Sequence, residues 1–175
     1  TGLQRLGKRI VWELERDLYL VFHLMIAGRF RWREPGAPVP GRVGLAAFDF
    51  EKGTLILTEA GARRHASLHV VASRGQLADH DPGGIDVFAS TPDEFARQLR
   101  RENHTLKRAL TDPRLFSGIG NAYSDEILLA SRLSPLQLTS RLGDEEIGRL
   151  LTETRALLRR WREALIKDAG EAFPE

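Results

Sequence analysis

The residues with the clearest chemical potential lie between positions 107 and 126, around two glycines separated by one residue. Gly118 and Gly120 let the backbone approach another molecule closely, and Asn121 opens a predicted helix directly after them. The first N–H groups of a helix have no partner within it, so they are available to an anion. Lys107, on the preceding predicted helix, adds positive charge. The pattern favours a site for nucleic-acid phosphates, although a tight connection with Asn121 as a helix cap is an equally good interpretation.

Lys8 and His23 form a second pair of candidates, fifteen residues apart near the start of the chain. The β-rich residues at 8–14 and 18–24, separated by turn-forming residues, predict a hairpin. Both side chains could face a common groove from these two strands. Taken without other evidence, a solvated lysine and a buried histidine are the simpler interpretation.

Met25 and Ile26 end an apolar segment that begins at position 18. At the tip of a strand, either side chain could insert between bases, as apolar side chains of DNA-kinking proteins do. By itself, however, the segment at 18–26 predicts a buried strand with both residues in the core.

The remaining polar residues indicate no catalytic or metal site. No pair of carboxylates is arranged for acid–base catalysis, and the five histidines lack the spacing of metal ligands. The absence of cysteine excludes disulfides and thiolate metal sites, and fits a reducing cytoplasm.

Composition and charge indicate a soluble globular protein with an anionic partner. Hydrophobic residues make up 42% and charged residues 29% of the 175 positions, and no apolar run approaches the roughly 20 residues that cross a membrane. The net charge is +2 and the isoelectric point about 9.3. Lysines and arginines concentrate at 97–114 and 155–167, which favours nucleic acid, although most charge runs simply face water.

The order of predicted elements is β-rich first and helical second, which defines the α+β class. We expect a β-rich lobe at residues 1–88 and a helical lobe at 89–175. Thr91 followed by Pro92 and acidic residues is typical of a helix start. The predicted strands lie at 8–14, 18–24, 28–32, 44–50, 54–58 and 66–71, and the predicted helices at 92–101, 105–110, 121–131 and from 144 onward, the last with an apolar face that reaches Leu165.

Three segments together resemble the formamidopyrimidine-DNA glycosylase / endonuclease VIII superfamily of base-excision repair. Residues 6–11 resemble the family strand that carries a lysine, and residues 23–29 resemble its His-Leu-Gly-Met-Ser/Thr-Gly segment. Residues 102–126, with Gly-Ile-Gly-Asn at 118–121, resemble its helix–two-turn–helix module. The resemblance covers nearly the whole chain, and implies an incomplete antiparallel β-sandwich followed by a helical DNA-binding lobe.

The resemblance also implies an activity. Such glycosylases and AP lyases flip an oxidised or otherwise damaged base out of duplex DNA, cleave its N-glycosidic bond, and nick the abasic strand by β-elimination. The residues implied to contact DNA are Lys8, His23, Lys107, Gly118, Gly120 and Asn121, and the candidates for filling the void left by the flipped base are Met25, Ile26, Arg63 and Arg64.

Three departures from the family pattern limit this implication. The N-terminal Pro-Glu, whose proline amine attacks the sugar, does not stand at Thr1-Gly2. The four cysteines of the family's C-terminal zinc finger are also missing, so zinc is expected only in a finger outside this chain, and no cofactor within it. Residues 58–65 replace the Asp-Pro-Arg-Arg-Phe-Gly of many members, which indicates a divergent subfamily. We therefore expect the chain to bind DNA without a catalytic residue of its own.

Two classes of function follow. The first is the middle part of a bacterial DNA glycosylase, expected to be monomeric, cytoplasmic and nucleoid-associated, with damaged duplex DNA as partner and no membrane. The alternative is a non-enzymatic RNA- or DNA-binding module, because ribosomal small-subunit proteins also use a helix–two-turn–helix with a Gly-Ile-Gly turn.

Overall fold

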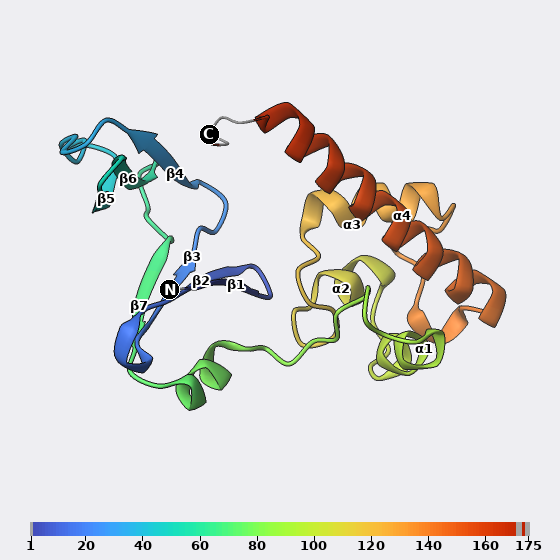
Figure 1. Cartoon of the computed structure of the whole chain (residues 1–175). Coiled ribbons are helices and arrows are strands. Elements are labelled where there is room, and N and C mark those ends of the chain that lie inside the picture. Colours follow the sequence, from blue (N-terminus) through green and yellow to red (C-terminus); the bar gives the residue numbers. More distant parts are fainter. Residues whose placement is uncertain (1, 171–172, 174–175) are drawn as a thin grey trace. The chain divides into compact units, whose positions relative to one another are not determined.

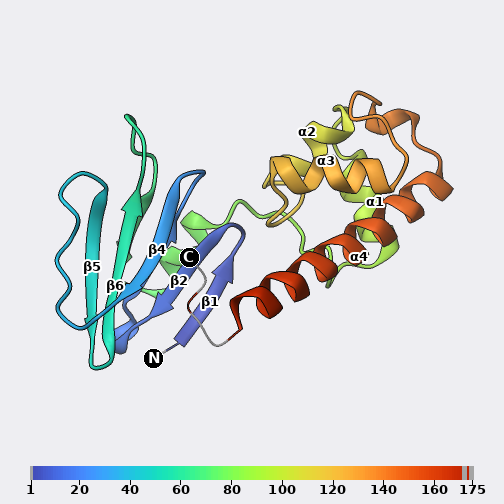
Figure 2. The ribbon, with the colours of Figure 1, turned by 90° about the horizontal axis from the view of Figure 1, so that it is seen from above.

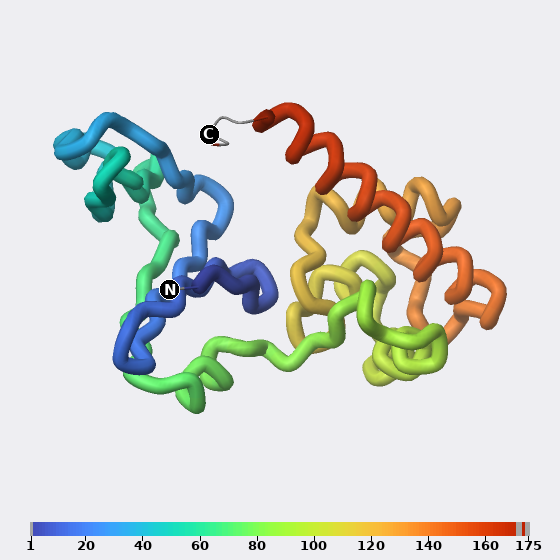
Figure 3. Tube along the Cα trace, in the orientation of Figure 1, coloured from blue at the N-terminus to red at the C-terminus, as the bar shows by residue number. Residues whose placement is uncertain are grey.

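A computed structural model describes residues 2–170 and 173 of the chain. Figure 3 follows the chain from the strands to the helices, in the order that the sequence predicts. The chain divides into two compact units, which we describe separately. The first holds residues 2–5 and 9–76 together with the end of the last helix from Lys167, and the second holds residues 6–8 and 77–166.

Two β-sheets make up the first unit (Figure 2). Strands β1 (Gly2–Leu6), β2 (Arg9–Glu13), β3 (Tyr19–His23) and β7 (Ser67–Val71) form one sheet in that order. Strands β4 (Gly28–Arg33), β6 (Gly53–Glu59) and β5 (Gly44–Phe50) form the other. The pairs β2–β3, β3–β7, β4–β6 and β5–β6 are antiparallel, which confirms the predicted antiparallel arrangement.

An aromatic core lies between the two sheets. Phe22 on β3 and Phe30 on β4 are buried, and their ring centroids are 5.2 Å apart. Trp12 on β2 lies 4.7 Å from Phe22 and 4.9 Å from Phe48 on β5, measured between ring centroids. Because side chains alternate between the faces of a strand, the apolar positions of Gly-Arg-Phe-Arg-Trp enter this core and its arginines face outward.

Four α-helices and one core form the second unit (Figure 1). They are α1 (Pro92–Arg100), α2 (Leu106–Thr111), α3 (Asn121–Ala130) and α4 (Asp144–Ala169), with 3₁₀ turns at Arg74–His80 and Thr139–Arg141 leading into this region and into α4. Thr91 and Glu94 form a reciprocal capping box at the start of α1, as the sequence predicts. No helix within the described residues combines the length and apolarity needed to span a bilayer.

The structure corrects four sequence-based expectations. Lys8 lies in the turn between β1 and β2 and not in a strand, because a separate strand, β1, precedes it. Strand β3 ends at His23, so Met25 and Ile26 are 48% and 89% exposed and do not belong to the core. The apolar face of α4 packs against the core only as far as Trp161, and Leu165 is 55% exposed. Asn121 is the first residue of α3 but not its cap, since Gly120 takes that position.

Candidate nucleic-acid interface

The turn before α3 is fixed to the helical unit by both backbone and side-chain contacts. The Ser117 N–H donates to the Ile85 carbonyl at 2.8 Å, and the Ile85 N–H donates to the Leu115 carbonyl at 3.0 Å. Ile119, between the two glycines, is 1% exposed and belongs to the core of the unit. Gly118 has φ 87°, a conformation that favours glycine. The buried Ile119 therefore anchors the turn, and its neighbours remain at the surface.

The start of α3 presents backbone donors without partners. Its first intrahelical bond runs from the Ser124 N–H to the Gly120 carbonyl at 2.9 Å, and no side chain caps the helix. The preceding N–H groups, of residues 121–123, have no backbone acceptor within the described part of the chain. Such a helix end carries partial positive charge and attracts anions. The exposed Asn121 side chain stands at the same end. Because Gly120 is the N-cap of α3, the interpretation of Asn121 as an N-cap is wrong.

Lys8 joins this helix end from a distant part of the sequence. Its Nζ lies 3.6 Å from the position that a Cβ on Gly120 would occupy. It makes no ion pair with any of the described residues, and partial burial lowers the pKa of its ammonium below the ordinary value of about 10.5. Lys8, Asn121 and the backbone donors of α3 therefore form one positively charged cluster, which we call the Lys8–Asn121 site. A phosphate oxygen has the charge and the acceptor geometry that this cluster requires.

Lys107 has a partner within the protein. Its ammonium contacts both carboxylate oxygens of Asp125 on α3, at 2.7 and 2.8 Å, so the pair connects α2 to α3. Both side chains remain partly exposed, at 41% and 54%. An exposed pair of this kind is weak, and a phosphate can compete with the carboxylate for the lysine.

Removing this carboxylate should strengthen DNA binding. In Asp125→Asn the Lys107 ammonium is released, so we expect affinity for duplex DNA to rise about twofold to tenfold. The slope of log affinity against log salt should also steepen by up to about 0.9, the value of one added phosphate contact. Asp93→Asn, which removes an exposed carboxylate on α1, gives the same change in net charge and is the control. Equal affinities of the two variants would exclude a specific role of Lys107.

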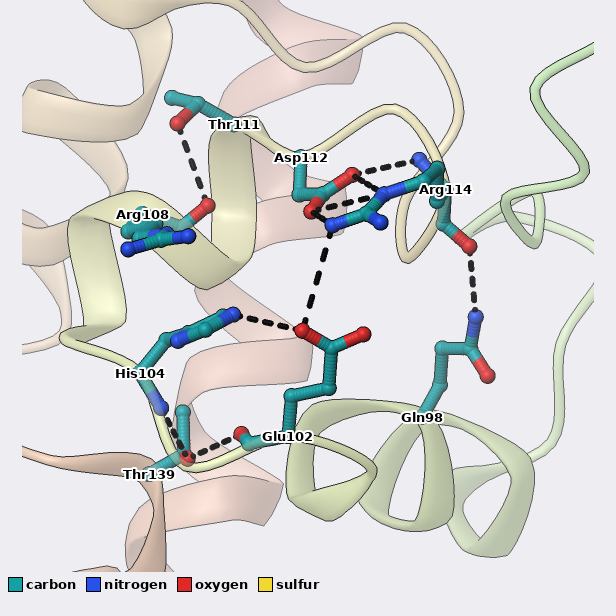
Figure 4. A network of polar contacts seen from close by, with 8 residues as sticks. All are labelled: Gln98, Glu102, His104, Arg108, Thr111, Asp112, Arg114 and Thr139. Atoms are coloured by element: carbon teal, nitrogen blue, oxygen red, sulfur yellow. Dashed lines mark hydrogen bonds and ion pairs between the residues drawn. The ribbon is translucent and has the colours of Figure 1, made fainter.

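A network of polar side chains connects the loop that follows α2 to the segment between α1 and α2 (Figure 4). Arg114 donates from Nη2 to Asp112 at 2.6 Å and lies 3.9 Å from Glu102, which in turn contacts His104 at 2.7 Å. The Thr139 hydroxyl donates to the Glu102 carbonyl at 2.9 Å. The hydrogen bonds from Arg114 hold the pKa of Asp112 below its ordinary value of about 3.8. The network thus ties the loop that follows α2 to the connection between α1 and α2.

The lowered pKa of Asp112 has a consequence for stability. A carboxyl whose pKa is lower in the folded state stabilises the fold above its unfolded pKa, and this contribution disappears as pH falls through the folded pKa. Asp112→Asn should therefore destabilise the helical unit by roughly 1 kcal/mol at neutral pH, and by less as pH falls below about 3.8. Urea unfolding of both proteins between pH 7 and 3 measures this difference, and a pH-independent difference would contradict the assignment.

The remaining residues that the sequence predicts to contact DNA lie in the first unit. His23 ends β3, opposite Arg9 in the β2–β3 register. Met25, with φ 55°, and Ile26 occupy the tight turn into β4, where the Arg29 guanidinium donates to the Ile26 carbonyl at 3.0 Å. Arg63 and Arg64 lie in the exposed loop between β6 and β7.

The sequence did not reveal the carboxylates that pair with these basic residues. The pairing of Lys107 with Asp125 was not predicted, and Asp112 and Arg114 were not connected to Glu102. The one local signal was the Asp-Pro-Arg spacing, because an Asp side chain commonly binds the backbone two residues further on. The structure shows this bond, from the Arg114 N–H to Asp112 at 2.8 Å.

The residues present do not fit the zinc site that the resemblance implies for the family. Among the described residues, no three His, Cys, Asp or Glu side chains could hold a metal ion together. The full sequence contains no cysteine, so it offers none of the four thiolate ligands of a zinc finger.

Comparison with known proteins agrees with this geometry. Residues 85–170 match the family model of the formamidopyrimidine-DNA glycosylase H2TH domain. Formamidopyrimidine-DNA glycosylases of Mycoplasma genitalium and Acidothermus cellulolyticus are 30% and 32% identical, over 84% and 97% of this chain and 52% and 59% of theirs. The solved structure of Lactococcus lactis formamidopyrimidine DNA glycosylase, bound non-covalently to DNA containing an AP site, matches with TM-score 0.80 and 26% identity, over 91% of this chain and 62% of that one.

The β-sheets followed by a helix–two-turn–helix unit define the class of fold, and confirm the predicted α+β organisation. The chain belongs to the formamidopyrimidine-DNA glycosylase / endonuclease VIII superfamily. It spans just over half the length of the curated relatives that it matches.

Proposed function

We propose that this chain is the DNA-binding part of a base-excision-repair glycosylase and AP lyase that acts on an oxidised or otherwise damaged base. The observation that carries the proposal is the position of the Lys8 ammonium beside the start of α3, where Asn121 and unpaired backbone donors lie at the surface. The relatives' name and the DNA in the related Lactococcus lactis structure support the same partner.

In this proposal each group has a physical role. Lys8, Asn121 and the N–H groups of α3 bind phosphates of the damaged strand and fix its register, because phosphate contacts position a duplex without reading its sequence. His23 adds a further phosphate contact. Met25 and Ile26, which are exposed on a tight turn, fill the space of the flipped base together with an arginine from residues 63–64.

We further propose that the 175 residues bind DNA without cutting it, as a monomer in the bacterial cytoplasm. The family reaction uses an N-terminal proline amine to attack the sugar C1′, and no Pro-Glu stands at Thr1-Gly2. Borohydride trapping on damaged duplex is expected to yield no covalent adduct with this chain, and an adduct would show a nucleophile among its residues.

Binding measurements test the proposal directly. The chain should bind a duplex with a tetrahydrofuran abasic-site analogue more tightly than the same duplex undamaged, and both more tightly than structured RNA. Affinity should fall steeply with salt, since each phosphate contact adds about 0.9 to the slope. Preference for RNA, or binding that does not change with salt, would overturn the proposed function.

A further inference from the structure

A buried carboxylate holds the loop that carries Arg63 and Arg64. Glu59, the last residue of β6, is 2% exposed although it is ionisable. Its carboxylate accepts the His65 N–H at 2.9 Å at each oxygen and the Ala66 N–H at 2.9 Å. These bonds lower the pKa of Glu59 below its ordinary value of about 4.5, so the group is charged at neutral pH. One side chain therefore joins the start of the loop to its end.

The same loop is tied to the segment before β5. The Glu59 N–H donates to the Val43 carbonyl at 2.8 Å, and the Arg64 guanidinium donates to the Arg42 carbonyl at 2.8 Å. Gly61, with φ 134°, supplies the conformation that the loop needs to turn back. The loop at 60–66 is therefore closed by contacts within the protein.

These contacts distinguish the two arginines. Arg64 donates a hydrogen bond to the Arg42 carbonyl. The exposed Arg63, by contrast, has no hydrogen bond or ion pair within the part of the chain that the structure describes. A buried carboxylate is costly to desolvate unless donors compensate its charge, and for Glu59 the His65 and Ala66 N–H groups supply this compensation only in the observed loop conformation. A preformed loop also reduces the entropy lost when a side chain enters a duplex.

We propose that Glu59 and Arg64 are positioning residues that hold the 60–66 loop in the conformation from which Arg63 enters damaged DNA. The proposal rests on the proposed function and adds to it the division of roles between the two arginines. Neither positioning side chain needs to touch DNA. Glu59→Gln keeps the shape of the side chain but loses the charge, and its amide can accept at only one atom.

The test measures the displacement of the base opposite the abasic site independently of protein folding and of DNA affinity. The probe is a duplex in which 2-aminopurine stands opposite a tetrahydrofuran abasic-site analogue. The fluorescence of 2-aminopurine rises when this base loses its stacking with its neighbours. At a saturating protein concentration, the wild-type chain should increase the 2-aminopurine fluorescence. The variants Arg63→Ala, Glu59→Gln and Arg64→Lys should not produce this increase. Glu59→Asp, which keeps the carboxylate, should recover part of it. Glu94→Gln, which also removes a carboxylate bonded to a backbone N–H, should keep the wild-type signal.

The outcomes separate the two levels of proposal. If the wild-type chain shows no preference for the abasic duplex, the proposed function fails. If it binds and Arg63→Ala loses the signal while Glu59→Gln and Arg64→Lys keep it, the positioning role is wrong. Should Glu59→Gln not fold, as seen by thermal melting, Arg64→Lys decides alone, because its change lies at an exposed side chain.

Discussion

Replacing Lys8 by alanine is expected to weaken binding to abasic-site duplex roughly tenfold to a hundredfold. The reason is that the Lys8 ammonium lies beside Gly120, the N-cap of α3, without an ion pair among the described residues, and a hydrogen bond to a charged group contributes about 1.5–3 kcal/mol. Loss of one phosphate contact should also reduce the salt slope by about 0.9. Fluorescence anisotropy over a range of salt concentrations measures both quantities.

A second lysine provides a matched control for this prediction. Lys52 lies in the turn between β5 and β6, as Lys8 lies in the turn between β1 and β2. Lys52→Ala changes the net charge by the same amount, so it isolates position from charge. If both variants weaken binding equally, the Lys8–Asn121 site has no special role and the effect is one of general electrostatics.

Local signals in the sequence predicted the helices well. The capping box at Thr91 and Glu94 fixes the start of α1 by bonds between neighbouring residues, so it can be recognised without knowing the fold. The same holds for Asn121, because the glycine-rich turn before it interrupts one helix and permits the next. In these cases the interactions that decide the structure lie within a few residues of one another.

Predictions failed where the apolar pattern continues beyond the buried part of an element. An apolar run predicted a buried strand up to Ile26, but the Gly28 N–H bonds to the Leu24 carbonyl at 2.9 Å and closes a turn that exposes the side chain. Leu165 continues the apolar period of α4 beyond the part of the helix that the core covers. Periodicity shows which residues share a face, but only the packing of other segments shows how far that face is buried.

The candidate site shows the same division. Lys8 and the turn at Gly120 and Asn121 were predicted separately as DNA contacts, and the structure shows that the Lys8 ammonium lies beside Gly120 although the two residues are more than a hundred positions apart. Pairings such as Lys107 with Asp125, or the Glu59 carboxylate with the loop at 60–66, were not predicted. The residues next to a carboxylate in the sequence do not indicate which group will donate to it. Its partners can therefore be identified only once the fold is known.

Truncating Phe116 should have the largest effect on stability, because this ring supports the turn at Gly118–Gly120 from the core. Phe116 is fully buried, and its ring centroid is 4.9 Å from that of Phe95 on α1. Phe116→Ala leaves a cavity that costs about 3–5 kcal/mol. Since small domains are stable by only about 5–15 kcal/mol, much of the stability of the helical unit should be lost.

The control for this change is Leu129→Ala on α3, where the side chain is 80% exposed. It should alter the free energy of unfolding by less than about 0.5 kcal/mol, since surface substitutions seldom do more. Urea unfolding followed by circular dichroism compares the two variants. Because Phe116→Ala removes no donor from the Lys8–Asn121 site, its DNA affinity should approach that of the wild type at low temperature and fall as the helical unit unfolds. Weak binding at every temperature, with the helical signal intact, would instead show that the ring sets the geometry of the turn beyond its contribution to stability.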